Sequence, residues 1–148
     1  MRAVVQRVKR CSVAAGDEVI SRGGEGLLVL LGVQKGDGAG ELEYLAEKIL
    51  NLRVFPDEEG RMNRSVLDIE GDLIVVSQFT LLADTRKGRR PSFAAAEEPE
   101  KAESIYERFV ERLRDTGLEV GTGSFGAMML VSLDNWGPVT LVIDSPSR

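Results

Sequence analysis

The apolar and polar positions along the chain predict several strands and two amphipathic helices. Residues 1–10 alternate like a strand with one wet face, and residues 26–33 form a nearly continuous apolar run, typical of a buried central strand. Apolar residues recur at spacings of three and four in residues 41–52 and, more clearly, in residues 99–116. This order predicts an α/β domain. The domain is α+β-like, because a mainly β core carries two helices packed on its outside.

Shorter segments extend the predicted sheet. Ser12–Ala15 and Glu18–Arg22 flank the pair Gly16-Asp17, which suits a two-residue hairpin turn. Leu118–Val120 is expected to be a further strand after the second helix, which Gly117 ends.

Two further segments end or interrupt strands with polar or rigid residues. Leu73–Leu82 begins as a buried strand and ends in Ser77–Leu81, whose polar groups suit a binding site or simply an alternating strand with solvent-facing hydroxyls. Ala127–Leu133 and Val139–Ile143 are strand-like runs on either side of a turn at 134–138. Composition alone favours a hairpin connector there, because glycine and proline are turn residues.

Length and composition predict a single domain covering residues 1–148. No apolar run reaches the roughly 18 residues needed to cross a bilayer. The N-terminal residues alternate in the manner of a strand and lack the apolar core of a signal peptide. One cysteine, Cys11, excludes an intrachain disulfide, and we therefore expect a cytoplasmic protein.

The chain contains no histidine, which excludes Ser-His-Asp and Cys-His catalysis. We expect neither a metal nor a cofactor, so the chemistry must use hydroxyls, carboxylates, amides, backbone groups or the substrate itself. The net charge of −5 argues against broad nucleic-acid coating. Residues 86–90 nevertheless hold four cations, among them Lys87, Arg89 and Arg90, which suit either a phosphate-binding spot or an ordinary solvated loop.

Three separated segments carry a family resemblance. They are Ser77-Gln78-Phe79-Thr80-Leu81, the loop Lys87–Phe93, and Asn135-Trp136-Gly137-Pro138-Val139-Thr140. With these segments the chain resembles the D-aminoacyl-tRNA deacylase family over essentially its whole length. Trp136 departs from the family pattern, because a small or acidic residue is common at that position.

The resemblance implies a barrel-like β fold, a homodimer and a proofreading enzyme. Such enzymes hydrolyse the ester that joins a D-amino acid to the 3′-terminal adenosine of tRNA. The resemblance further implies that the bond between Gly137 and Pro138 is cis, and that this pair enters the active site of the partner subunit. The carbonyl groups of Gly137 and Pro138 would then bind the α-ammonium of the substrate, so that an L side chain is excluded and glycyl-tRNA is a residual substrate.

The resemblance also assigns Ser77, Gln78, Phe79 and Thr80 to the floor of the catalytic pocket, where they would position the ester and stabilise the oxyanion. Phe79 is equally compatible with a core position. Thr80 is a possible nucleophile, but no histidine is present to activate it. The terminal ribose hydroxyl of the substrate, already beside the ester, is the favoured activator of water.

Three more residues are assigned by the resemblance. Arg7 is expected to brace the Gly137-Pro138 pair, although an exposed strand cation has the same pattern. Phe125 and Met129 are expected to line the adenosine pocket, or else to be core residues.

Two other classes of function stay open at this stage. A non-catalytic RNA- or small-ligand-binding dimeric module would use the same groove without turnover. A structural oligomer would use the Gly137-Pro138 pair only to lock a dimer.

Overall fold

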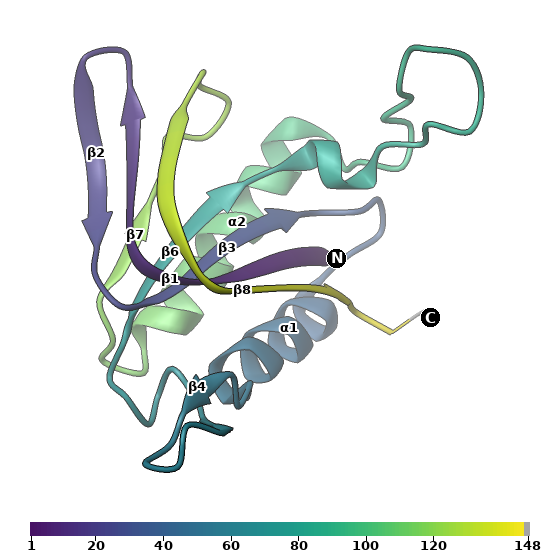
Figure 1. The fold of residues 1–148 in the computed structure, drawn as a ribbon. Helices are drawn as coiled ribbons and strands as arrows, with labels where there is room; N and C mark the ends of the chain where they lie inside the picture. The colour runs from purple at the N-terminus through teal and green to yellow at the C-terminus, as the bar shows by residue number, and fades with distance from the viewer. Residues whose placement is uncertain (147–148) are drawn as a thin grey trace.

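The computed structural model describes residues 1–146, which form a six-stranded sheet, a two-stranded ribbon and two helices (Figure 1). Residues 147 and 148 of the predicted domain lie outside the described part. The strands of the sheet are β1 (Arg2–Ala15), β2 (Glu18–Gly23), β3 (Gly26–Gly32), β6 (Asp72–Ser77), β7 (Val120–Thr122) and β8 (Leu130–Asp144). The ribbon consists of β4 (Phe55–Pro56) and β5 (Met62–Arg64), and the helices are α1 (Ala39–Asn51) and α2 (Pro99–Arg114).

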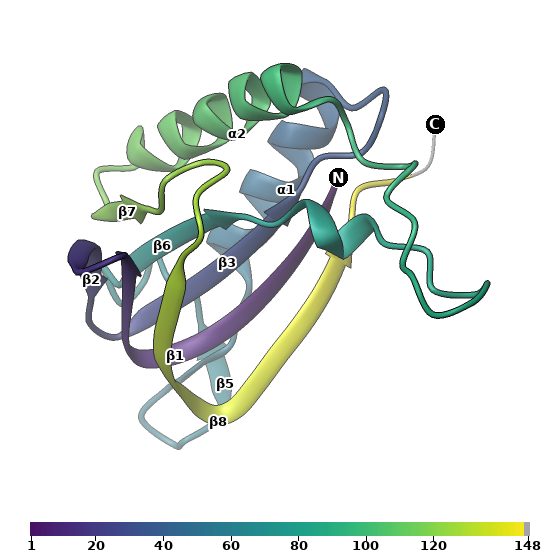
Figure 2. The ribbon, with the colours of Figure 1, turned by 90° about the horizontal axis from the view of Figure 1, so that it is seen from above.

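The strands follow the order β2-β1-β3-β6-β7, and β8 lies along the other edge of β1. β1 and β8 are long and strongly bent, so that the sheet curls toward a nearly closed, barrel-like shape (Figure 2). Residues 2–8 of β1 pair with β3 and residues 11–15 pair with β2, while β8 accompanies both halves. The predicted fold class is confirmed.

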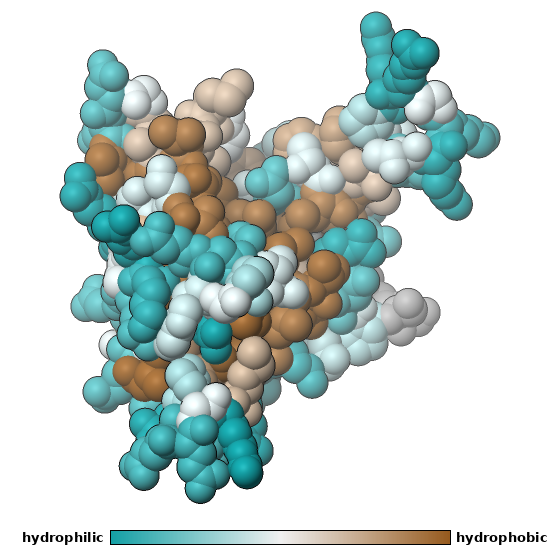
Figure 3. Space-filling model, in the orientation of Figure 1, coloured by the Kyte–Doolittle hydropathy of each residue, from teal (hydrophilic) through white to brown (hydrophobic). Residues whose placement is uncertain are grey.

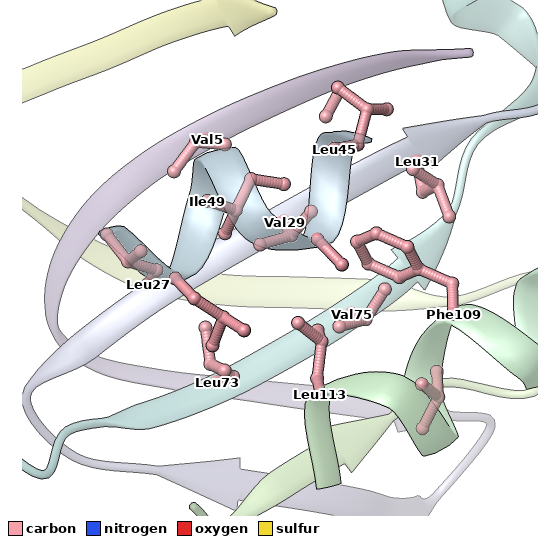
Figure 4. Close-up of a cluster of buried hydrophobic side chains, with 14 of the residues drawn as sticks. Val5, Leu27, Val29, Leu31, Leu45, Ile49, Leu73, Val75, Phe109 and Leu113 are labelled. Carbon is pink, nitrogen blue, oxygen red and sulfur yellow. The ribbon is translucent and has the colours of Figure 1, made fainter. Parts of the chain in front are cut away.

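Both helices pack on one face of the sheet (Figure 2). Their apolar stripes supply Ile49 of α1 and Phe109 of α2, which meet Val29 and Val75 of the central strands in one cluster (Figure 4). The opposite face of β3 and β6 is covered by a second cluster that includes Leu28 and residues from the first half of β8. The central strand is therefore covered on both faces, as the continuous apolar run predicted.

The predicted hairpin at residues 134–138 is wrong. Residues 130–135 and 140–144 both pair antiparallel with β1, so β8 runs on in one direction through the Gly137-Pro138 pair. The 14-residue strand β1 is long enough to pair with both halves. The Gly-Pro pair therefore interrupts the hydrogen-bonded ladder without reversing the chain.

Other boundaries also differ from the prediction, among them those of the helices, which occupy Ala39–Asn51 and Pro99–Arg114 rather than 41–52 and 99–116. The expected strand Leu73–Leu82 ends at Ser77, and residues Phe79–Leu82 form a short 3₁₀ helix, η1. The strand expected at Leu118–Val120 instead occupies Val120–Thr122. The hairpin between β1 and β2 is confirmed at its predicted turn. Within residues 1–146, no helix combines the length and apolarity needed to span a membrane.

Candidate functional site

A cavity of about 540 Å³ opens where β6 ends, beside the start of α2 and the loop that leads into β8. Its lining includes Ser77, Gln78, Phe79, Phe125 and Met129, five of the residues assigned from the sequence. The structure therefore brings together residues from distant parts of the chain, because β6 and the loop before β8 flank the same end of the sheet.

The wall at the end of β6 is held in place by the backbone. The amide of Gln78 donates a 2.8 Å hydrogen bond to the carbonyl of Leu31, which fixes the point where the strand becomes η1. As the first residues of a helix, Phe79 and Thr80 have amide groups without an intrahelical acceptor. Backbone donors at such a position suit a developing oxyanion.

Phe79 is not a core residue, since 55% of it is exposed. Its ring meets Phe93 edge to face at a centroid distance of 5.0 Å, and both rings line the cavity. Phe93 was not assigned to the site from the sequence, although it lies within the motif Lys87–Phe93. Lys35, Glu97 and Glu98 also line the cavity, and no sequence motif marked them.

Phe125, which lines the cavity, packs against Tyr106 of α2. The Tyr106 hydroxyl donates a 2.6 Å hydrogen bond to the carbonyl of Val75, and its ring lies 6.0 Å from that of Phe125. Burial raises the pKa of Tyr106 to about 12, so the hydroxyl stays a neutral donor at physiological pH. Phe125 and Met129 each line the cavity and also pack, partly buried, against a core cluster; the binding of adenosine beside them stays a prediction.

Side-chain nucleophiles lack activation in the described residues. Thr80 is exposed and absent from the cavity lining, and its hydroxyl accepts a short hydrogen bond from the Gln78 amide rather than donating to a base. Cys11 is buried away from this cavity, and burial raises the pKa of its thiol to about 11. Residues 1–146 also contain no group of three or more Cys, Asp or Glu side chains placed to hold a metal ion.

The Gly137-Pro138 pair forms an exposed ridge on β8, and its peptide bond is cis. The flanking ladder pairs are Val8 with Asn135 and Gln6 with Thr140. Between these pairs, the four residues 136–139 of β8 face Arg7 alone. The ladder therefore does not position the ridge, and side-chain hydrogen bonds, among them those of Arg7, hold it instead.

Arg7 is 7% exposed, which excludes the interpretation of a solvated strand cation. Its Nε donates to the carbonyl of Trp136 at 2.8 Å, and its Nη1 donates to the carbonyl of Val54 at 2.6 Å. Gly137 has φ of +134°, and a Cβ there would lie 2.9 Å from Nη2 of Arg7. Glycine is thus required both by the backbone angle and by the close approach of the guanidinium.

The ridge and the cavity lie apart within one chain. None of Arg7, Gly137 and Pro138 lines the cavity. In both ribbon views the bend of β8 lies away from η1 and the start of α2 (Figures 1 and 2).

The basic loop projects from the body beyond η1 (Figure 1). Two backbone hydrogen bonds of 2.8 and 2.9 Å between Asp84 and Ser92 close its base. Arg86 pairs with Asp84 at 2.7 Å, and this hydrogen bond lowers the pKa of the carboxyl. Within the described residues, no ion pair engages the exposed cations Lys87, Arg89 and Arg90.

Comparisons with known proteins agree with these features. The family model for D-Tyr-tRNA(Tyr) deacylase matches residues 4–144. A D-aminoacyl-tRNA deacylase of Aquifex aeolicus is 57% identical over 145 residues, and the match covers 98% of each chain. A D-aminoacyl-tRNA deacylase of Syntrophomonas wolfei is 58% identical over 145 residues, and the match covers 98% of this chain and 97% of the relative. A solved structure of a c-Myc DNA unwinding element binding protein superposes with a TM-score of 0.93 at 48% identity, covering 99% of this chain and 100% of the other. The chain belongs to the D-Tyr-tRNA(Tyr) deacylase family.

Proposed function

We propose that the protein hydrolyses the ester bond of D-aminoacyl-tRNA, releasing the free D-amino acid and tRNA. The observation that carries this proposal is the exposed Gly137-Pro138 ridge in a chain of the deacylase family. The role is chiral proofreading in translation, which places the protein in the cytoplasm.

The complete site in this proposal needs two copies of the chain, with the ridge of one copy in the cavity of the other. The separation of ridge and cavity within one chain supports this arrangement. Apolar surface is exposed on the face over β8 and beside η1 (Figure 3). Leu130, Leu141 and Val142 of β8 are among the exposed large apolar residues, and a second chain would cover such an edge strand.

Selection follows from the geometry of a rigid backbone ridge. The carbonyl groups of Gly137 and Pro138 accept hydrogen bonds from the α-ammonium of the substrate, which holds the α-carbon against the ridge. An L side chain then meets the ridge, whereas a D side chain points away from it. Glycine has no Cβ to exclude, so glycyl-tRNA is a residual substrate.

Hydrolysis in this proposal uses the substrate's own ribose hydroxyl rather than a side-chain nucleophile. The hydroxyl lies next to the ester and orients water at high effective concentration. Ser77, Gln78 and the amide groups at the start of η1 position the ester and stabilise the oxyanion. The absence of a base beside Thr80 in the described residues supports this route.

The basic loop contacts phosphates of the acceptor stem in this proposal. The exposed cations Lys87, Arg89 and Arg90, which have no ion-pair partner among residues 1–146, support this role, and such contacts are independent of base sequence.

The first test is incubation with D-tyrosyl-, L-tyrosyl- and glycyl-tRNA, measured as loss of the aminoacyl ester. We expect rapid loss from the D form, slow loss from the glycyl form, and from the L form only a trace of loss that becomes measurable at high enzyme concentration. Several other D-aminoacyl-tRNAs should also react, because the ridge contacts the substrate at its α-ammonium and α-carbon and not at its side chain. Binding without ester loss would support a non-catalytic module instead, and neither binding nor loss would support a structural oligomer.

The second test mixes two defective chains. Gly137→Ala disturbs the ridge, because its Cβ would meet Arg7 and Val139 within 3 Å. Ala127→Trp fills the cavity that Ala127 lines. Mixed dimers contain one intact cavity facing one intact ridge, so we expect them to regain up to about half of the wild-type D-selective activity. Mixed dimers as defective as either parent would contradict the exchange of ridges between subunits.

The third test separates the two routes of hydrolysis. We expect Thr80→Ala to retain activity within about tenfold, and a tRNA with a terminal 2′-deoxyadenosine to lose about 100-fold or more, as general catalysis by a positioned group predicts. Single-turnover rates measure both effects. Loss with Thr80→Ala together with full activity on the 2′-deoxy substrate would establish Thr80 as the nucleophile.

The fourth test concerns the basic loop. Replacing Lys87, Arg89 and Arg90 by glutamine should weaken tRNA binding and lower the slope of log K against log salt by about 2–3, because each lost contact contributes roughly 0.7–0.9. The matched control replaces the exposed cations Lys48, Arg61 and Arg64 in the same way. Equal slopes for the two triple variants would rule out a phosphate contact at the loop.

A further inference from the structure

Trp136 immediately precedes the ridge, and its peptide carbonyl is the group that Arg7 holds at 2.8 Å. Because this carbonyl belongs to the peptide bond that enters Gly137, its position sets where the ridge begins. Residues 136–139 make no ladder pair with β1, so side-chain contacts decide that position.

The indole of Trp136 lies against two cations of β1. Cζ of Arg7 is 4.2 Å and Nζ of Lys9 is 3.6 Å from the ring centroid. Cations this close to an aromatic ring are attracted by its quadrupole, and tryptophan gives the strongest such attraction. Phe55 adds an aromatic contact at a centroid distance of 6.4 Å. The indole ring is thus held against β1, the strand that carries Arg7 and Lys9.

Lys9 is itself held from a second direction. Its ammonium lies 3.3 Å from a carboxylate oxygen of Glu25, while its side chain is about half exposed. An exposed pair of this kind adds little stability, so we expect loss of the Lys9–Glu25 pair to have little effect on folding.

The far side of the ridge has a separate brace that does not involve Trp136. Oδ1 of Asn135 accepts the amide of Val139 at 3.1 Å, and Nδ2 of Asn135 donates to Oγ1 of Thr140 at 3.0 Å. These bonds join the two limbs of the bulge to each other, whereas the contacts of Trp136 with Arg7 and Lys9 join the bulge to β1.

We propose that Trp136 and Lys9 are positioning residues for the chiral filter. The indole, held by the Lys9 ammonium and the Arg7 guanidinium, keeps the Trp136 carbonyl on Arg7 and so fixes the ridge that excludes L side chains. This inference rests on the proposed function, since it names the residues that keep its filter rigid. A filter that works by exclusion fails when it moves by a fraction of a side-chain radius, so loosening the ridge admits the L substrate before it abolishes hydrolysis of the D substrate.

The test compares kcat/KM for D- and L-tyrosyl-tRNA in variants with confirmed unfolding temperatures. We expect Lys9→Gln to lower the D-to-L ratio about two- to fivefold, the size of an exposed cation–π contact, with an unchanged unfolding temperature. Lys9→Arg should restore the ratio. Trp136→Ala should lower the ratio by about tenfold or more. The ratio of Trp136→Phe should lie between that of Trp136→Ala and that of the wild type.

Arg10→Gln is the matched control. Arg10 lies next to Lys9 on β1, is exposed and pairs with Asp134 at 2.7 Å, but its contacts do not include Trp136. Replacing it removes one positive charge from β1, as Lys9→Gln does, and should leave the D-to-L ratio unchanged.

A selective wild-type protein whose ratio stays unchanged in both Lys9→Gln and Trp136→Ala would overturn this inference alone. If Trp136→Ala does not fold, an unchanged D-to-L ratio in both Lys9→Gln and Trp136→Phe would overturn this inference instead. A wild-type protein without activity on the D substrate would overturn the proposed function, and this inference with it.

Discussion

The buried guanidinium of Arg7 is the contact on which the functional geometry depends. Where four residues of β8 face a single residue of β1, the hydrogen-bonded ladder has no means of placing the chain. Arg7 replaces it with two bonds, one to the carbonyl of Trp136 and one to that of Val54. Burial strengthens both bonds, because a charge removed from water interacts more strongly with the dipoles around it. A flexible bulge thereby becomes a rigid ridge joined to the segment that follows α1.

A rigid ridge is of particular value in a chain without histidine. Recognition by backbone carbonyls needs no titratable group, and the described residues offer no activated side-chain nucleophile beside the cavity. The buried Cys11 thiol, with its pKa raised to about 11, carries almost no thiolate at neutral pH. Chemistry that relies on placement of the substrate fits this set of groups better than covalent catalysis does.

The sequence predicted most of the fold, but it wrongly predicted that the chain reverses at residues 134–138. The stripes of α1 and α2 and the apolar run of β3 were readable because each buries a whole face, and periodicity reports burial. The hairpin at 134–138 was wrong because local composition records only that Gly137 and Pro138 break a ladder. Whether the chain then reverses or continues depends on the length of β1, a distant partner. Phe93 was missed as a cavity residue for a similar reason, since only the closed base of the basic loop brings it to Phe79.

That closed base also connects the two parts of the proposed tRNA site. The pairing of Asp84 with Ser92 makes a narrow stem, and Phe93 at its foot packs on the wall of the cavity. Cations at the tip and the cavity at the foot are therefore parts of one continuous segment. The net charge of −5 disfavours broad contact with RNA, so the cluster of cations on the projecting loop is a local site of positive charge on an acidic protein. In the proposed function, long-range electrostatics at the loop attract the nucleic acid, and the terminal ester binds in the cavity at the foot of the loop, whose lining includes Lys35, Glu97 and Glu98. The proposed function thus assigns affinity for tRNA and selection for chirality to different segments of the chain, so that a substitution in one segment need not alter the role of the other.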